Sequence, residues 1–150
     1  MAFNIMKAVI QRVANAEVII SNHLYSSINV GLCIFLGIKN TDTIKNVEQL
    51  VNKIIHLRIF PDSKNKMNKS ILDIQGEALV ISQFTLYANC KKGNRPSFND
   101  AASKLIASPL YELFINLLKE KKIHVRTGQF GADMNIQLNN NGPVTIIVEQ

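Results

Sequence analysis

The alternation of apolar and polar positions predicts several strands in the first two thirds of the chain. Met6 to Val13 and Glu17 to Ile20 have the pattern of strands, with a turn or bend near Ala14-Asn15. Gly31 to Ile38 is an almost wholly apolar run between glycines, which is typical of a strand covered on both faces. Ala78 to Thr85 predicts a further strand that becomes polar at its end.

Two other stretches have the periodicity of helices. Thr41-Asp42 is expected to cap a helix that continues toward His56. The apolar residues of that helix recur at helical spacing: Ile44, Val47, Leu50, Val51, Ile54 and Ile55. Ser108-Pro109 offers an N-cap followed by proline at the first helical position of a second helix. Its apolar face consists of Leu110, Leu113, Phe114, Leu117 and Leu118.

Short strands and loops account for the rest of the chain. Arg58 to Phe60 predicts a strand that Pro61 ends, and the lysine-rich stretch 62–70 predicts a loop. Three further strands are expected at Ile123 to Thr127, Met134 to Leu138 and Val144 to Glu149. Because 150 residues fit one compact core and no repeat or linker is visible, residues 1–150 are expected to form a single domain. The fold class is therefore α/β, with mostly antiparallel strands and two principal helices.

Composition adds a preference for an anionic partner. The chain has 17 Lys and Arg against 11 Asp and Glu, a net charge of +6. Such an excess attracts polyanions, of which nucleic acid is the commonest, although solubility alone also explains a basic surface. Tryptophan is absent and aromatic residues are few, so a large stacking platform for single-stranded nucleic acid is not expected.

The two cysteines and the absence of targeting signals indicate a cytoplasmic protein without a membrane segment. Cys33 lies in an apolar run and is expected in the core, whereas Cys90 lies in a polar loop and could be exposed. They have no CxxC spacing, no leader pattern is visible, and no apolar run approaches 18 residues.

The common signatures of metal, nucleotide and serine-hydrolase sites are missing. His23, His56 and His124 stand alone, so no metal site is expected. The chain has neither GxGxxG nor GxxxxGK[ST], and it lacks the GxSxG motif of a serine nucleophile. No cofactor is expected, and a hydrolase built on this sequence would depend on backbone donors.

Two polar segments are candidates for chemistry and binding. Ser82-Gln83-Phe84-Thr85 follows an apolar strand, where unpaired N–H groups could form an oxyanion hole, although these residues could equally be the exposed positions of a half-buried strand. Lys91, Lys92 and Arg95 surround Gly93 in a basic loop that suits phosphates, and a solvated loop is the alternative.

The stretch Asn139-Asn140-Asn141-Gly142-Pro143 contains conflicting signals. Asn-Gly between two apolar strands ordinarily indicates a tight hairpin. Pro143 removes a backbone N–H at the start of the next strand and restricts Gly142, so a special backbone is also possible.

Several segments in a fixed order resemble the D-aminoacyl-tRNA deacylase family over nearly the whole chain. They are KAVIQRV, GLCIFLG, KIIHLRIFPDSKNKMNKSI, SQFTLYANCKKGNRPSF and GQFGADMNIQLNNNGPVT. The resemblance implies a layered α/β/β fold and a homodimer with active sites at the subunit interface. It also implies hydrolysis of the ester of D-aminoacyl-tRNA, and of mischarged glycyl-tRNA, as an editing activity.

The resemblance assigns roles to particular residues. Ser82, Gln83, Phe84 and Thr85 would form the catalytic segment at the aminoacyl-adenosine pocket. Gly142-Pro143 would be joined by a cis bond and would reach into the partner subunit's pocket as a chiral filter. The residues implied to support that filter are Arg12, which would hold the dipeptide, and Met134, Val144 and Thr145. Lys91, Lys92 and Arg95 would bind tRNA.

The resemblance also implies a sparse mechanism, in which backbone donors stabilise the oxyanion and the terminal 2′-hydroxyl of the tRNA assists. A nucleophilic Thr85 is the minority alternative, since no partnered base is visible. Many family members have Asp where this chain has Asn141, and both residues suit a turn. A non-catalytic nucleic-acid-binding module is the competing hypothesis for the whole chain.

Overall fold

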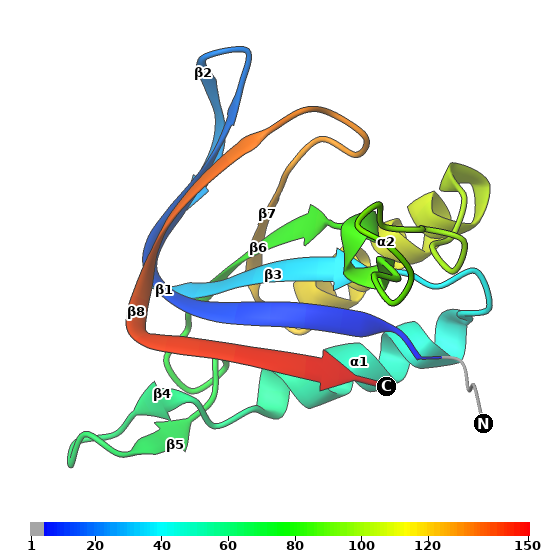
Figure 1. Ribbon diagram of the computed structural model, residues 1–150. Coiled ribbons are helices and arrows are strands. Elements are labelled where there is room, and N and C mark those ends of the chain that lie inside the picture. The colour runs from blue at the N-terminus through cyan, green and yellow to red at the C-terminus, as the bar shows by residue number, and fades with distance from the viewer. Residues whose placement is uncertain (1–4) are drawn as a thin grey trace.

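The computed structural model describes residues 5–150, which form a strongly curved six-stranded sheet covered by two helices (Figure 1). The sheet order is β2-β1-β3-β6-β7, and β8 pairs with β1. Its strands are β1 (Lys7–Ile20), β2 (His23–Ile28), β3 (Gly31–Gly37), β6 (Glu77–Ser82), β7 (His124–Thr127) and β8 (Asn135–Glu149). The helices are α1 (Ile44–His56) and α2 (Lys104–Glu120), and a 3₁₀ helix, η1 (Phe84–Tyr87), follows β6.

Two apolar cores lie on opposite faces of the sheet. Leu32, Ile34 and Leu36 of β3 point toward the helices, while Cys33, between them, points to the other face. The second core is enclosed because the sheet curls over itself, and the hydroxyl of Ser26 on β2 donates to the carbonyl of Thr127 at 2.7 Å. The α/β/β layering and the mostly antiparallel pairing are therefore confirmed, with β3–β6 and β6–β7 as the parallel pairs.

The prediction that β3 is covered on both faces is confirmed, and so are the two cysteine environments. Six of the seven residues of β3 are buried. Cys33 is buried and Cys90 is exposed. Removal from water raises the pKa of the Cys33 thiol to about 12, so this cysteine is a packing residue.

Of the turn or bend predicted near Ala14-Asn15, the structure has a bend, because β1 is one continuous strand of 14 residues with register shifts in this region. The apolar side chains of β1 change here from one face of the sheet to the other. The pairing of β1 with β8 shifts register between Gln11 and Val13, and again between Val13 and Ala16. Such bulges bend a strand and redirect its side chains, so β1 contributes first to the core under the helices and then to the core inside the curl.

Of the two alternatives at Asn141-Gly142-Pro143, the hairpin is wrong, because β8 runs without a turn from Asn135 to Glu149, and the special backbone is present as a cis peptide bond between Gly142 and Pro143. Local turn chemistry was overridden by β1, which pairs with β8 along almost its entire length. Strand β2 was not predicted, because its residues Leu24 and Tyr25 are largely exposed and give no clear apolar pattern.

Several boundaries differ from the prediction. The N-cap of α1 is Thr43 and not Thr41-Asp42, since the carboxylate of Asp42 instead accepts the backbone N–H of Lys39 at 2.7 Å. Helix α2 begins at Lys104 after the N-cap Ser103, and Pro109 lies inside it. At the sixth position of the helix a proline removes one backbone donor and crowds the carbonyl four residues earlier, a cost that the packing of α2 offsets.

The remaining corrections concern β4, β5 and β6. Strand β6 ends at Ser82, since the chain turns into η1 and does not continue to Thr85. The strand predicted from Arg58 to Phe60 is shifted, since β4 spans Phe60–Pro61 and has Pro61 as its last residue. The predicted loop 62–70 contains β5 (Met67–Lys69), which pairs with β4 in a small hairpin that projects from the body (Figure 1). Over residues 5–150, no helix is both long and apolar enough to cross a membrane.

Candidate active site

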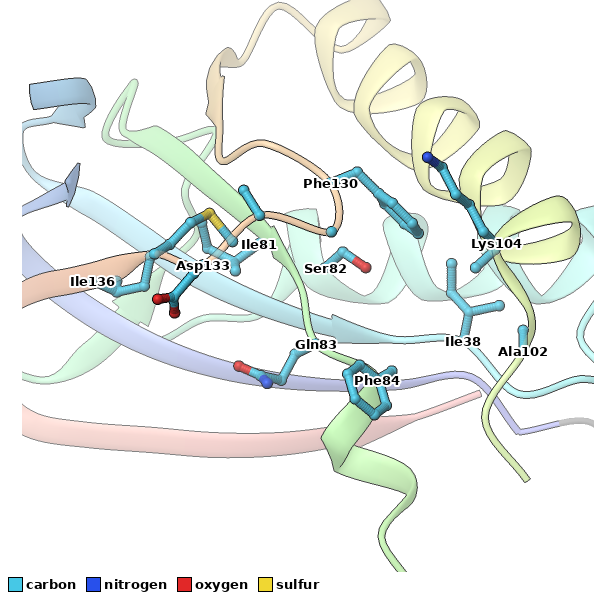
Figure 2. A pocket seen from close by; sticks show the side chains of 14 residues that line it. Ile38, Ile81, Ser82, Gln83, Phe84, Ala102, Lys104, Phe130, Asp133 and Ile136 are labelled. Atoms are coloured by element: carbon cyan, nitrogen blue, oxygen red, sulfur yellow. The ribbon is translucent and has the colours of Figure 1, made fainter. Parts of the chain in front are cut away.

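A cavity of about 400 Å³ opens at the carboxyl end of β6, a size suited to a small ligand or the end of a larger one. Its walls come from the end of β6, the start of α2 and the loop that joins β7 to β8. In Figure 2, Ser82 lies in the middle, Lys104 is on the side of Ile38 and Ala102, and Asp133 is on the side of Ile136. The lining residues are Ile38, Ile81, Ser82, Gln83, Phe84, Ala102, Lys104, Ala107, Phe130, Gly131, Ala132, Asp133, Met134 and Ile136.

Sequence reasoning placed three of these side chains, Ser82, Gln83 and Phe84, at a substrate pocket, and the structure gathers them at this cavity. Thr85 lies beside them in η1 but lines a more open depression with Val9, Phe35 and Gln83. The walls made by Ala102 and Phe130 were missed. A single small or aromatic residue in a loop carries no local signal for a cavity, because only the fold brings these loops together.

The backbone donors of the segment differ from the expectation for a strand end. The N–H of Gln83 is used, since it donates to the carbonyl of Leu36 at 2.8 Å. The N–H groups of Phe84 and Thr85, at the start of η1, donate to no acceptor within residues 5–150. The first N–H groups of a helix are unpaired by geometry, so η1 leaves two adjacent donors, of which the first belongs to Phe84, a residue that lines the cavity.

The hydroxyl of Thr85 has an amide as its partner. The Nε2 of Gln83 lies 2.6 Å from the Oγ1 of Thr85, and no other hydrogen bond of this hydroxyl occurs in the described part of the chain. Neither the oxygen nor the nitrogen of a side-chain amide is basic enough to remove a proton near neutral pH. The arrangement therefore holds the segment in shape and offers no base that would activate Thr85 as a nucleophile.

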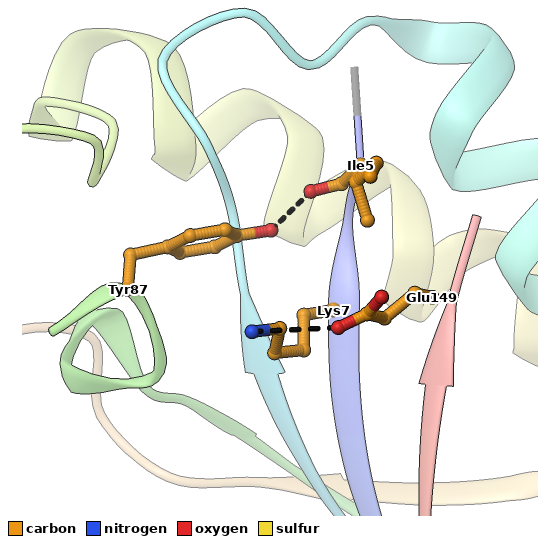
Figure 3. A network of polar contacts seen from close by, with 4 residues as sticks. All are labelled: Ile5, Lys7, Tyr87 and Glu149. Atoms are coloured by element: carbon orange, nitrogen blue, oxygen red, sulfur yellow. Dashed lines mark hydrogen bonds and ion pairs between the residues drawn. The ribbon is translucent and has the colours of Figure 1, made fainter. Parts of the chain in front are cut away.

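Tyr87, at the end of η1, fixes the segment to the start of β1 (Figure 3). Its hydroxyl donates to the carbonyl of Ile5, and the ammonium of Lys7 lies 5.4 Å from the centre of its ring. Lys7 is in turn 3.4 Å from the carboxylate of Glu149 on β8. Burial and the negative charge of Asp42 raise the pKa of Tyr87, so the phenol keeps the proton that it donates.

The close approach of Gly37 gives η1 a second support. A Cβ on Gly37 would lie 3.0 Å from both the Cβ of Leu86 and the Cε2 of Tyr87.

Met134 lies on the opposite wall of the cavity, where a Cβ on Gly128 would lie 2.6 Å from its sulfur. Met134 therefore packs over a bare glycine and belongs to the cavity. In this chain it is not a neighbour of the dipeptide with which the sequence-based prediction grouped it.

Gly142-Pro143 forms a bulge on β8, away from the cavity of the same chain. Gln11 pairs with Thr145 and Val13 pairs with Asn140, so a single residue of β1, Arg12, faces residues 141–144. The Gly142–Pro143 peptide bond is cis, and both residues are exposed. None of the residues that line the cavity belongs to this bulge.

Arg12 joins the bulge to a neighbouring segment. Its Nε donates to the carbonyl of Asn141 at 2.9 Å, and its Nη1 donates to the carbonyl of Ile59 at 2.7 Å. Its Nη2 would lie 3.0 Å from a Cβ on Gly142. Because Asn141 is held through its backbone and its side chain makes no hydrogen bond within residues 5–150, Asp or Asn can serve at this position.

Polar side chains close the neck of the bulge. Thr145 accepts hydrogen bonds from Gln11 at 3.1 Å and from Asn140 at 2.9 Å. Asn140 also accepts the backbone N–H of Val144 at 3.1 Å. Sequence reasoning included Val144 and Thr145 but missed Asn140, whose role depends on the four-to-one pairing opposite Arg12.

The basic loop that carries Lys91, Lys92 and Arg95 lies next to the cavity. It is closed by two backbone hydrogen bonds between Asn89 and Ser97, and all three cations are exposed. The rings of Phe84 and Phe98 meet edge to face with centroids 5.1 Å apart, which ties this loop to the cavity rim. Within the described residues, no group of three or more His, Cys, Asp or Glu could hold a metal ion.

A strand-end cavity with a free backbone donor, joined to a basic loop through Phe84 and Phe98, is suited to an acyl ester on a polyanionic carrier, and the comparisons define the class. The chain belongs to the D-Tyr-tRNA(Tyr) deacylase family, whose model matches residues 9–149. It is 51% identical over 144 residues to the D-aminoacyl-tRNA deacylase of Clostridium botulinum (strain Alaska E43 / Type E3), covering 96% of this chain and 97% of that one. The enzyme of the same name from Aquifex aeolicus (strain VF5) is 52% identical over 144 residues, with the same coverage.

Two solved structures share the fold. The c-Myc DNA Unwinding Element Binding Protein superposes with a TM-score of 0.90 at 40% identity, covering 96% of this chain and 98% of that chain. A probable eukaryotic D-amino acid tRNA deacylase superposes with a TM-score of 0.84, covering 97% of this chain and 100% of that chain. At 15% identity, the second likeness shows the fold alone. The chain is accordingly a member of a family of hydrolases that act on ester bonds.

Proposed function

We propose that this protein is an editing hydrolase that cleaves the ester of D-aminoacyl-tRNA and of mischarged glycyl-tRNA. The observation that carries the proposal is the cavity at Ser82, Gln83 and Phe84, in a chain that matches deacylases over nearly its full length. The 3′-terminal aminoacyl-adenosine of the tRNA enters this cavity. The exposed cations Lys91, Lys92 and Arg95 of the loop that follows η1 contact the phosphates of the same tRNA.

The chemistry we propose needs no activated side chain. An aminoacyl ester is already reactive, and a fixed position beside preorganised donors lowers the barrier to attack by water. The unpaired N–H groups of Phe84 and Thr85 are the donors available to the oxyanion that forms on the ester carbonyl. The vicinal 2′-hydroxyl of the terminal adenosine assists proton transfer, since the pairing of Thr85 with Gln83 supplies no base.

Selection against L-aminoacyl-tRNA is assigned to Gly142-Pro143 of a second subunit. Within one chain the dipeptide is exposed and does not line the cavity, so it reaches a cavity only if two copies associate. Rigid carbonyl groups facing the substrate's α-carbon leave room for hydrogen but not for a Cβ, so an L-side chain clashes whereas glycine and D-side chains fit. Arg12, Thr145 and Asn140 hold the bulge rigid enough for this role. A cytoplasmic homodimer acting on tRNA is the corresponding assembly.

The stereochemical proposal is tested by incubating the purified protein with D-Tyr-tRNA and L-Tyr-tRNA. We expect the D-form to be hydrolysed at least about 100-fold faster, a margin that steric exclusion of a whole side chain can supply. Equal rates on the two substrates would contradict the filter. Salt-sensitive tRNA binding without hydrolysis of either would instead support a non-catalytic nucleic-acid-binding module, the reading that the exposed basic loop alone favours.

The role of Thr85 gives a separate prediction. We expect Thr85→Ala to keep turnover close to that of the unmodified protein, because the hydroxyl of Thr85 has only the Gln83 amide as a partner. A D-Tyr-tRNA ending in 2′-deoxyadenosine should instead lose at least about 100-fold in rate, the usual contribution of a proton-transfer group. Single-turnover kinetics with both 3′-linked substrates measure this. Abolished turnover in Thr85→Ala, with the 2′-deoxy substrate still cleaved, would establish the nucleophile instead.

A further inference from the structure

The small hairpin of β4 and β5, taken here as residues 58–69, is a basic projecting segment to which the proposed function gives no role. It contains four cations, Arg58, Lys64, Lys66 and Lys69, and a single carboxylate, Asp62. Every residue from Ser63 to Lys69 is exposed. Figure 1 shows the hairpin standing out from the curved sheet, on the side where β1 and β8 bend.

The hairpin is a built structure although it has only two short strands. Such a ribbon is marginal by itself, and here Asp62 organises its turn. The Oδ1 of Asp62 accepts the backbone N–H groups of Lys64 at 2.8 Å and Lys66 at 3.0 Å, and its Oδ2 accepts the amide of Asn68 at 2.7 Å. These bonds lower the pKa of Asp62, with the Asn68 bond first among the causes. Both carboxylate oxygens therefore accept hydrogen bonds from within the turn.

The ammonium groups of Lys64 and Lys66 at the tip are not paired with this carboxylate. Neither Lys64 nor Lys66 forms an ion pair within residues 5–150. Each is held through its backbone, whose N–H donates to Asp62. At the base, the guanidinium of Arg58 is held by the backbone and side-chain oxygens of Asn68 at 2.9 and 3.0 Å. An ordered ribbon with free lysines at its tip matches the needs of phosphate binding, in which cations position a nucleic acid without reading its bases.

The base of the hairpin is coupled to the bulge that carries Gly142-Pro143. Arg12 donates to Asn141 in the bulge and to Ile59 immediately before β4. Phe60 and Pro61 line a hollow of about 240 Å³ together with Arg12 and Asn141. No residue of the hairpin lines the cavity of its own chain. If the dipeptide enters another subunit's cavity, the hairpin is carried to the rim of that same cavity.

We propose that the β4–β5 hairpin binds the phosphate backbone of the tRNA whose 3′ end occupies the cavity of the other subunit. This inference rests on the proposed function for the identity of the RNA and for the placement of the dipeptide. Each active site then has two basic contacts, the Lys91–Arg95 loop of its own chain and the hairpin of the second chain.

Binding of uncharged tRNA tests the hairpin without requiring hydrolysis. We expect Lys64→Ala/Lys66→Ala to weaken binding on the order of tenfold, and the slope of log affinity against log salt to become shallower by between about 1 and 2. The matched control is Lys45→Ala/Lys53→Ala, which removes the same charge from the exposed face of α1. Fluorescence anisotropy at several salt concentrations measures both. Equal losses in the two variants, or no loss in the first, would overturn the proposal.

Catalysis separates this contact from the active site itself. The hairpin variant should hydrolyse D-tyrosyl-adenosine, which has no RNA backbone, at the unmodified rate, and D-Tyr-tRNA with a raised KM. A protein that binds tRNA through the hairpin but cleaves neither substrate would refute the hydrolase and leave the RNA contact standing. Loss of activity on D-tyrosyl-adenosine in the hairpin variant alone would refute the RNA contact.

Mixed dimers test the arrangement in trans. One subunit carries Lys64→Ala/Lys66→Ala, and the other carries Ala102→Trp, which fills its cavity. The open cavity then belongs to the lysine-deficient chain and receives the intact hairpin of its neighbour. We expect this dimer to process D-Tyr-tRNA with the KM of the unmodified protein. A KM as high as that of the dimer with both hairpins altered would show that the contact is made in cis.

Discussion

Gly142→Ala is expected to lower the preference for D-Tyr-tRNA over L-Tyr-tRNA by at least about 100-fold, or about 2.7 kcal/mol. Gly142 has a φ of +134°, a backbone conformation that residues with a Cβ rarely adopt. The added Cβ would lie 2.8 Å from the Cγ2 of Val144 and 3.0 Å from the Nη2 of Arg12. The bulge must therefore shift, and the carbonyl groups that exclude an L-side chain move with it.

Rates on the two substrates, measured with the same enzyme preparation, check this result. Gly93→Ala is the matched control, because Gly93 also has a positive φ, +68°, but a Cβ there meets nothing within 4 Å. Gly93 lies in the basic loop, so any loss of tRNA binding affects both substrates and cancels in the ratio. A Gly142→Ala protein that keeps the original ratio would show that the dipeptide does not select the substrate.

Gly31→Ala is expected to have the largest effect on stability, a loss above about 4 kcal/mol. Gly31 pairs with Glu77 where β3 and β6 run parallel. A Cβ on Gly31 would lie 1.7 Å from the carbonyl oxygen of Glu77 and 2.6 Å from its backbone nitrogen. Backbone cannot rotate away as a side chain does, so the two central strands must separate.

Urea unfolding followed by circular dichroism measures the loss in the free energy of unfolding. A Gly31→Ala protein that is recovered only in insoluble form would also agree with the prediction. For a chain of this size 1 kcal/mol corresponds to roughly 2–4 °C in melting temperature. Gly93→Ala, whose added methyl group has open space, should remain soluble and lose only about 1 kcal/mol from its positive φ. If Gly31→Ala melted within 4 °C of the unmodified protein, the packing of β3 against β6 would have to be looser than the structure has it.

The importance of Gly31 illustrates what a local pattern does and does not reveal. The sequence predicts a buried strand between Gly31 and Gly37 because its residues are almost all apolar, and that strand is present. It does not reveal that Gly31 faces the backbone of Glu77, because that contact depends on the parallel pairing of segments 46 residues apart. The same limit explains why Ala102 and Phe130 were not predicted at the cavity.

For this protein, the sequence by itself determined the composition of the layers and the family. Periodicity located both helices and most strands, since burial of one face imposes the same spacing wherever the element lies. The two motif segments, around Ser82 and Gly142, identified the family because their residue order is read directly from the chain. Tertiary structure decided everything that depends on a partner strand. It converted a hairpin signal at Asn141-Gly142 into a bulge on one continuous strand, because β1 pairs on both sides of it and Arg12 fills the gap. It also placed Met134 at the cavity and left the N–H groups of Phe84 and Thr85 unpaired, since these positions depend on distances between elements that no local pattern specifies.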